Sequence, residues 1–277
     1  MFIMLILYRI FSLYLEITHI THSVKIIVTY FHNNEQYSLI LLTINIMFMP
    51  ENDRFKFEDK ERDFPFYKEN PLLSKKAWIV LLILLIFGSL FGGGSTIHGS
   101  IIILLIMILP LLYYLNWDYQ ALFQKPKAKD ILLAIGLFVG YLVYAVAMSV
   151  LLERFGLTGG QLIEQSTVTF ISVIPLIFSL MTEEIIKLIP FLLLLRIFYK
   201  YTDNRKASII ISMIIVMLMF ASLHAYDFKM FLFAIFIQGF GSIFEFIGYI
   251  KTKNLLVSYI THLCTDAFIF MIAALSL

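Results

Sequence analysis

The chain has 277 residues, of which 60% are hydrophobic and 14% are charged, and its formal net charge is +2. Soluble domains are nearer half apolar and a quarter charged, so this composition excludes an ordinary soluble domain and indicates a polytopic membrane protein. The small net charge gives no reason to expect a nucleic-acid partner. A single cysteine, Cys264, excludes an internal disulfide and any zinc site built from several cysteines.

The first part of the chain differs in composition from the rest. Residues 1–48 are apolar but interrupted by polar side chains, and residues 50–76 are strongly polar with charges of both signs. The apolar run 1–15 is short for a membrane span, and no small-residue cleavage site follows it. We expect 50–76 to be a cytoplasmic tail and the natural start to be Met47 or Met49, with the preceding residues either upstream sequence or a loosely attached anchor.

Seven apolar runs of about membrane-spanning length follow, and they predict an all-α transmembrane helix bundle. The chain thus divides into an N-terminal segment, 1–76, and a transmembrane domain, 77–277. The fourth run is too long for one straight span, and Pro175 and Pro190 suggest that it is broken, kinked or extended beyond the bilayer. The predicted spans are about 77–95, 100–116, 131–152, 168–198, 207–226, 229–250 and 255–276.

Lysine and arginine in the short loops indicate the orientation of this bundle. The basic loop residues are Lys125, Lys127 and Lys129 after the second span, Lys200, Arg205 and Lys206 after the fourth, and Lys251 and Lys253 after the sixth. Seven spans place all of them on the side of the basic tail, whereas the loops at Gly92–Gly94 and Gly159–Gly160 are nearly free of basic residues. We therefore expect a cytoplasmic N-terminus and an external C-terminus.

The fourth span holds two adjacent carboxylates and a lysine, Glu183, Glu184 and Lys187, between apolar runs. Each charge inside hydrocarbon costs roughly 2.5–3.5 kcal/mol on insertion scales, so such groups mark a functional site by default. On a helix Lys187 follows the two glutamates at i+4 and i+3, so it can pair with either but hardly with both fully. One carboxylate is then left for chemistry. The structural alternative is an ion pair that only locks helix packing.

Later spans add further polar side chains. The fifth span ends near His224, and the seventh contains His262 and Asp266, which lie at i and i+4 on one helical face. One histidine on an apolar helix is most often a packing residue, but polar groups on three helices need partners in hydrocarbon, and the simplest partners are one another. The sequence therefore predicts a polar cavity inside the membrane. Glu245 and Gln238 of the sixth span are expected to line it or to bind neighbouring helices, in a structural role.

Missing motifs narrow the chemistry that these groups can perform. The sequence contains neither the Gly-x-Ser-x-Gly of serine hydrolases nor the His-Glu-x-x-His of helical zinc sites. An aspartyl dyad needs two intramembrane aspartates, and Asp266 is the one good candidate. What remains is a carboxylate and a histidine that deprotonate water beside oxyanion donors. The reaction class that fits is hydrolysis of a peptide bond at the membrane.

The order of three motifs on successive helices resembles the CPBP family, also called Abi or type II CAAX prenyl endopeptidases. The motifs are the glutamate pair Glu183–Glu184, the Phe-x-x-x-His of Phe220–His224 and the His-x-x-x-Asp of His262–Asp266. The glycines at 239, 241 and 248 also look like that family's pattern, and the resemblance covers about residues 165–277.

This resemblance implies a role for each motif residue. It implies that Glu183 and His224 activate water. It places His262 and Asp266 on the oxyanion side, with Glu184 in support. Bacterial members are linked to bacteriocin self-immunity and to the processing of peptide pheromones or surface proteins. The implied partner is thus a membrane protein or peptide substrate, in the lipid bilayer of a bacterial plasma membrane.

The chain departs from the family's pattern at one position. The family usually places an arginine four residues after the second glutamate, where this chain has Leu188, and Lys187 instead gives Glu-Glu-x-x-Lys. That form resembles the related PrsW-type proteases. Those proteases carry a glutamate at the position of His224, so the chain resembles the CPBP family more. Two other classes stay open: an inactive scaffold or immunity protein, and a transporter with a proton relay. Transport is favoured by paired broken helices, and the sequence shows one such segment.

A metal site is the alternative to this water activation. Glu183, His224, His262 and Asp266 are all zinc ligands by atom type. Helical zinc sites usually draw two histidines from one turn, whereas each histidine here stands on its own helix. The pair of His262 and Asp266 also suits a carboxylate that holds the imidazole tautomer. We therefore expect a mechanism without metal or cofactor, with zinc as the alternative.

Overall fold

A computed structural model of the chain describes residues 73–91, 96–157 and 170–275, together with four short strands between residues 25 and 43. The chain forms two compact units, residues 1–55 and residues 56–277. Several predicted features lie outside the described residues: the start at Met47 or Met49, the tail up to residue 72, and the loops at Gly92–Gly94 and Gly159–Gly160.

The strands of the first unit form two antiparallel pairs. One pair joins β2 (Thr29–His32) to β3 (Glu35–Ser38), and the other joins β1 (Lys25–Ile26) to β4 (Leu42–Thr43). They were not expected from the sequence, because strands of this length are too short to leave a clear alternating pattern. Two-stranded pairs are also at best marginally stable by themselves.

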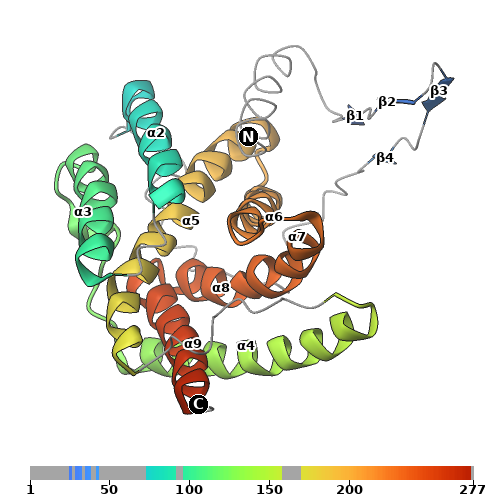
Figure 1. Ribbon diagram of the computed structural model, residues 1–277. Coiled ribbons are helices and arrows are strands. Elements are labelled where there is room, and N and C mark those ends of the chain that lie inside the picture. Colours follow the sequence, from blue (N-terminus) through green and yellow to red (C-terminus); the bar gives the residue numbers. More distant parts are fainter. Residues whose placement is uncertain are drawn as a thin grey trace. The chain divides into compact units, whose positions relative to one another are not determined.

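The described part of the second unit contains seven helical segments (Figure 1), one for each predicted span, and two separate 3-10 turns, η2 (Tyr119–Ala121) and η4 (Phe170–Ser172). The sixth begins as α7 (Phe228–Ala234), passes through a π-helical turn, η5 (Ile235–Gly239), and a 3-10 turn, η6 (Phe240–Ser242), and continues as α8 (Ile243–Thr252). The other six are α2 (Lys75–Phe91), α3 (Ile97–Tyr114), α4 (Ala128–Arg154), α5 (Val173–Thr202), α6 (Arg205–Leu223) and α9 (Leu255–Leu275). The predicted helical architecture of this region is therefore confirmed.

Five of the described helices are long and apolar enough to cross a membrane: α3, α4, α6, the combined α7–α8 segment and α9. Of the other two, α2 is shorter, with 17 residues, and α5 carries the charged stretch. Large apolar side chains cover outward positions on several helices, among them Ile79, Leu132, Val143 and Leu275. Such surfaces suit helices that are surrounded by lipid.

The fourth predicted span is one continuous helix rather than a broken one. α5 has 30 residues, which corresponds to about 45 Å, whereas the hydrocarbon core of a bilayer is about 30 Å thick. Pro175 is tolerated because it lies in the first turn, where the backbone N–H groups have no partner within the helix. Pro190 lies inside the helix. Of the three alternatives for this span, the helix length fits extension beyond the bilayer.

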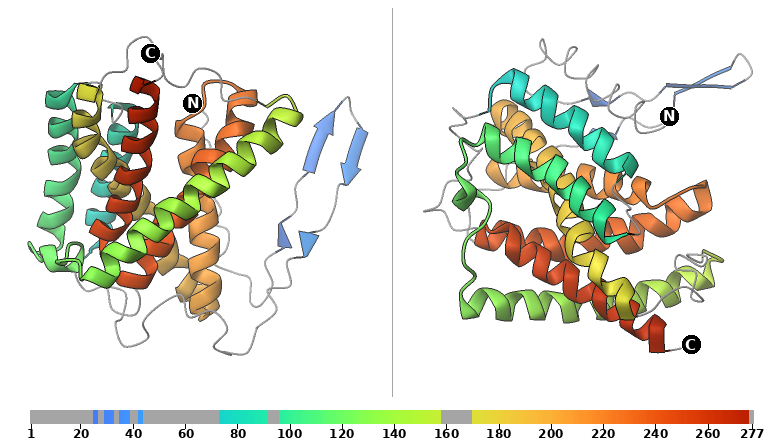
Figure 2. Two further views of the ribbon diagram at one scale, coloured as in Figure 1. Left: turned by 90° about the horizontal axis from the view of Figure 1, so that it is seen from below. Right: turned by 60° about the vertical axis from the view of Figure 1, so that its left-hand side comes forward.

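α5 is also the central helix of the second unit. It packs against α2, α3, α6 and α9, and most of its side chains between Ser179 and Leu195 are buried. In Figure 1 it lies between α3 and α6. On the other side of the unit, α4 crosses α9 obliquely (Figure 2) and also contacts α8. The charged stretch of the fourth span is therefore at the centre of the helical packing.

Two loops that are far apart in the sequence meet at one end of the helices. The Asn254 side chain accepts a hydrogen bond from the Gln124 amide at 3.1 Å and donates one to the Gln124 carbonyl at 2.7 Å. The amide of Leu255 also donates to the carbonyl of Leu122, at 2.9 Å. The basic loops after the second and sixth predicted spans therefore lie at the same end, as the predicted orientation requires.

Candidate functional site

Six ionisable side chains from three helices meet inside the helical unit, and we call them the polar cluster. α5 supplies three of them and α9 supplies two, and α8 adds one. The members are Glu183, Glu184, Lys187, Glu245, His262 and Asp266. Of the polar groups that the sequence predicted to contact one another, those of α5 and α9 do so, His224 of α6 is not among them, and Glu245 joins them.

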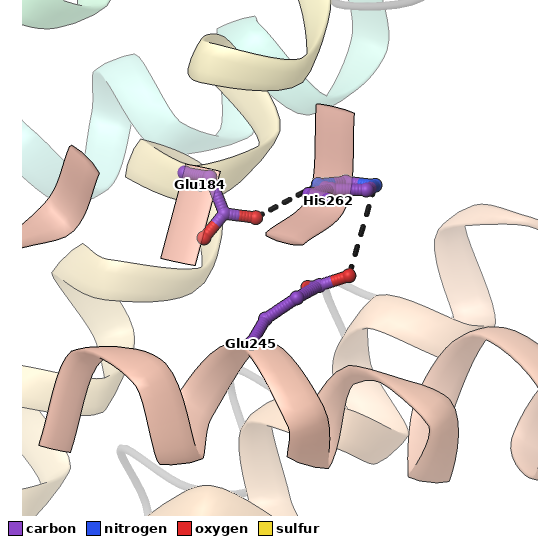
Figure 3. A group of neighbouring side chains, drawn as sticks. All are labelled: Glu184, Glu245 and His262. Carbon is purple, nitrogen blue, oxygen red and sulfur yellow. Dashed lines mark hydrogen bonds and ion pairs between the residues drawn. The ribbon is translucent and has the colours of Figure 1, made fainter. Parts of the chain in front are cut away.

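Glu184 is the most completely engaged carboxylate of the cluster. Its residue is 2% exposed, and its Oε1 lies 2.8 Å from Nδ1 of His262 and 2.5 Å from Nζ of Lys187. Its Oε2 accepts a hydrogen bond from the hydroxyl of Ser258. Because a carboxylate only accepts, Nδ1 of His262 carries a proton and Nε2 faces away from Glu184 (Figure 3).

Lys187 joins two carboxylates from different helices. Besides its contact with Glu184, its ammonium forms an ion pair and hydrogen bond with Glu245 of α8. The ammonium also lies 4.7 Å from the ring centroid of Phe220, a cation–π distance. A small cavity with room for about one water adjoins Lys187 and Ser258. Of the two glutamates that Lys187 could reach along α5, it therefore pairs with the second.

The Nε2 side of His262 is loosely surrounded. Its nearest carboxylate oxygens belong to Asp266 at 3.7 Å and to Glu183 and Glu245 at 3.9 Å each. These separations exceed a hydrogen bond and are of the length that a bridging water serves. The side chains of Glu183 and Asp266 are 24% and 30% exposed, so they form the open edge of the cluster.

One predicted pairing within the cluster is not the one that forms. The carboxylate on Nδ1 of His262 belongs to Glu184, and Asp266 approaches only the other ring nitrogen. The physical reason is the length and origin of the two side chains. Asp266 has a short side chain and lies one turn further along the same helix, whereas Glu184 extends a longer side chain from α5. The imidazole tautomer is thus held from a neighbouring helix.

His224 lies next to the cluster rather than within it. It caps the C-terminal end of α6, its Nδ1 lies 3.0 Å from the Phe220 carbonyl, and the two rings are 4.6 Å apart. Since a carbonyl only accepts, Nδ1 of His224 donates this hydrogen bond. Among the described residues, no hydrogen bond or ion pair joins His224 directly to Glu183.

Two polar residues near the cluster were missed in the sequence. Ser258 stands one turn before His262, and this i, i+4 spacing was a usable signal. Tyr141 of α4 gave no signal, because only packing brings it here. Its ring lies 2.6 Å from where a Cβ of Gly241 would be and 6.0 Å from the ring of Phe244, the residue before Glu245.

The possible metal ligands differ from those expected. Ligand atoms of Glu184, Glu245 and His262 lie within 4.8 Å of one another, and of the four predicted zinc ligands this group includes only His262. The ammonium of Lys187 contacts both carboxylates of the group. A cation is therefore already built into this position by the chain itself, and the group fits that ammonium better than it fits an added metal ion.

Comparisons of the chain with protein-family models, with curated proteins and with solved structures find no match. A functional interpretation therefore depends on the residues of the cluster and on their surroundings. Two features matter most: the adjacent glutamates differ in their partners, and His262 is held at one ring nitrogen only.

Proposed function

We propose that the protein is a membrane-embedded endopeptidase, of the CPBP or type II CAAX-protease kind, that hydrolyses a peptide bond with a water activated by Glu183. The observation that carries this proposal is the contrast between the two adjacent glutamates. Glu184 is buried and bonded to three side chains, whereas Glu183 is partly exposed and lies 3.9 Å from Nε2 of His262. A carboxylate without a strong partner, beside an oriented imidazole, is an arrangement suited to activating water.

In this reaction Glu183 removes a proton from water, and the oxygen of the water attacks the carbonyl carbon of the peptide bond. Nε2 of His262 faces the oxyanion that develops, and the Glu184 carboxylate on Nδ1 supports positive charge on the ring. The proton held by Glu183 passes to the leaving nitrogen as the C–N bond breaks. Asp266 at the open edge and His224 next to the cluster are assigned to contact the substrate or its water.

The five apolar helices support a membrane setting, and the resemblance of the motifs suggests the substrate and the roles. All seven helical segments would span a plasma membrane, and the substrate is a membrane protein or a peptide bound at the bilayer, with bacteriocin self-immunity or the processing of surface proteins as the roles. Lys187 meets Glu184 one turn later, as in the Glu-Glu-x-x-Lys of PrsW-type proteases, and this observation favours a PrsW-like enzyme as the nearest alternative.

An inactive scaffold or immunity protein is the alternative from another class. It is favoured by the ion pairs that Lys187 forms with both Glu184 and Glu245, because charges with a purely structural role also neutralise one another in this way. The two proposals differ in what they require of Glu183. A scaffold does not require a partly exposed carboxylate whose one ion-pair contact among the described residues, with Nε2 of His262, is 3.9 Å long.

Substrate trapping with Glu183→Gln tests the proposal. Membranes that contain this variant should accumulate a protein or peptide that wild-type membranes cleave, and peptide mass spectrometry should identify both it and the cleavage site. The control is Glu153→Gln, the same change at an exposed position near the end of α4. Identical peptides in wild-type and Glu183→Gln membranes would refute the protease and leave the scaffold.

A second comparison tests the division of roles between the two glutamates. Glu183→Gln should leave the protein folded and abolish cleavage. Glu184→Gln and Lys187→Leu should instead lower the amount of folded protein, because each leaves a buried charge without its partner, at roughly 3–5 kcal/mol. The measurements are protein level in membranes and cleavage per folded molecule. Normal levels with equal loss of cleavage in all three variants would contradict this division.

A further inference from the structure

Glu245 was expected to play a structural part, but its contacts connect it to the orientation of His262. It reaches from α8 to the ammonium of Lys187, and the same ammonium contacts Oε1 of Glu184. That oxygen is also the one that lies on Nδ1 of His262. The four side chains thus form a continuous series across three helices, and Figure 3 shows Glu184 and Glu245 on different sides of His262.

We propose that Glu245 is a positioning residue for the hydrolysis: by sharing the Lys187 ammonium with Glu184, it keeps Oε1 of Glu184 available to hold Nδ1 of His262. This inference rests on the proposed function and adds a residue that the three sequence motifs do not contain. Glu245 acts through Lys187 and Glu184, and its effect on the reaction is the direction in which Nε2 of His262 points.

Competition for one oxygen is the physical basis of this role. Oε1 of Glu184 lies 2.5 Å from the Lys187 ammonium and 2.8 Å from Nδ1 of His262, so the ammonium and the imidazole N–H share it as donors. With Glu245 present, the ammonium divides its hydrogen bonds between two carboxylates. Without that charge, the ammonium has Glu184 as its remaining carboxylate partner and binds it more strongly. The imidazole then loses its fixed acceptor and its orientation.

The position of Glu245 does not depend on this ion pair alone. The next residue, Phe246, packs its ring 5.1 Å from that of Phe191 on α5, and both rings are buried. α8 is therefore anchored to α5 beside the cluster even when the charge of Glu245 is removed. A substitution at Glu245 leaves this contact between α8 and α5 in place, and its effect is measured per folded molecule.

Two variants separate positioning from simple burial of charge. Glu245→Gln removes one charge and keeps the shape. Lys187→Met/Glu245→Met removes the competing ammonium together with its partner, a change that is often neutral for stability. If Glu245 only balances charge, Glu245→Gln reduces the amount of folded protein and the folded molecules behave like wild type. If it positions His262, the folded molecules themselves are altered, and the double variant restores them.

The first readout is turnover of the peptide identified by trapping, measured per folded molecule in detergent. Glu245→Gln should lower kcat by about tenfold or more, the size of effect that losing a supporting partner has at other buried sites, with KM little changed. The double variant should recover most of kcat, and Glu153→Gln should match wild type. Wild-type kcat in folded Glu245→Gln protein would overturn the proposal.

The second readout does not require activity. In protein labelled with ¹⁵N-histidine, the signals of His262 are identified by their loss in His262→Asn. The Nδ1 shift of His262 should move in Glu245→Gln and return in the double variant. An unchanged shift in Glu245→Gln would overturn the positioning role even if trapping had succeeded. A shift that moves and returns as expected, in a protein that traps no substrate, would uphold the positioning and refute the protease.

Discussion

Glu183 and Glu184 are neighbours in the chain with different surroundings. Successive residues of a helix point about 100° apart, so one side chain enters the core of the bundle while the next reaches its edge. Lys187 lies within reach of both along α5 and does not choose between them by spacing. The choice is made by α8 and α9, because Glu245, Ser258 and His262 all lie on the side of Glu184.

Two tyrosines of α4 should respond in opposite ways to the loss of their hydroxyls. Tyr141 packs against Gly241 and Phe244, next to Glu245 in the chain, so Tyr141→Phe removes a hydroxyl near the cluster and kcat should fall by roughly tenfold at an unchanged melting temperature. Tyr144 donates its hydroxyl to the Phe236 carbonyl at 2.7 Å. Tyr144→Phe should therefore lower stability by about 1 kcal/mol and leave kcat unchanged. Thermal unfolding and turnover, measured on both variants, check the pair, and the reverse pattern would show that Tyr141 is structural.

Removal of metal ions should leave the activity intact. The ammonium of Lys187 already contacts the two carboxylates that are closest to forming a metal site. After prolonged dialysis against a strong chelator, the purified protein should keep its turnover, and elemental analysis should find no stoichiometric metal. Activity that is lost to the chelator and restored by one equivalent of zinc would contradict the mechanism.

At the scale of the elements, the seven predicted spans and the seven helical segments agree in number and order, and their ends differ by a few residues. Length and hydropathy suffice for this, because a helix in lipid satisfies its backbone internally. The π-helical turn at Ile235–Gly239 had no such signal. It lies inside an apolar run, at a close approach to α6: a Cβ on Gly239 would lie 2.9 Å from the Met217 carbonyl.

Two glycine-to-alanine changes should therefore have opposite effects. Gly239→Ala places a methyl group against the backbone of α6. Because a backbone shift in a packed helix costs free energy, this variant should be destabilised by about 1–3 kcal/mol. At Gly136 of α4, nothing lies within 4 Å of the position that a Cβ would occupy, so Gly136→Ala should be neutral or stabilise the helix by up to about 1 kcal/mol. Thermal unfolding in detergent measures both, and equal melting temperatures would contradict the close approach of η5 to α6.

At the scale of the whole molecule, the hydrogen bonds between Asn254 and Gln124 constrain the topology. In a Cys264→Ser background, cysteines at Lys125 and Lys251 should be labelled from the cytoplasmic side. A cysteine at Phe155, at the far end of α4, should be labelled from outside only. Impermeant thiol reagents on intact cells and on inverted vesicles make this measurement. Cytoplasmic labelling at 155 would overturn the orientation that the basic loops indicate.

The sequence predicts which helices contribute to the site but not which side chains pair within it. It identifies which helices carry the ionisable groups, since charges in hydrocarbon must find one another. It does not identify the partner of Nδ1 of His262, which depends on side-chain reach between α5 and α9. The contribution of Tyr141 could not be found either, because α4 looks like any apolar span until α8 packs against it.

The depth of the polar cluster limits what a cut at this site would leave behind. His262 stands seven residues after the start of α9, and Glu245 stands seven before the end of α8, so both lie about 10 Å from the loop that joins these helices. A cut at this depth removes about seven residues from a helical substrate span of about twenty, and the remaining thirteen or so are too few to cross a bilayer. Cleavage there would therefore not only divide a substrate but also end its anchorage in the membrane.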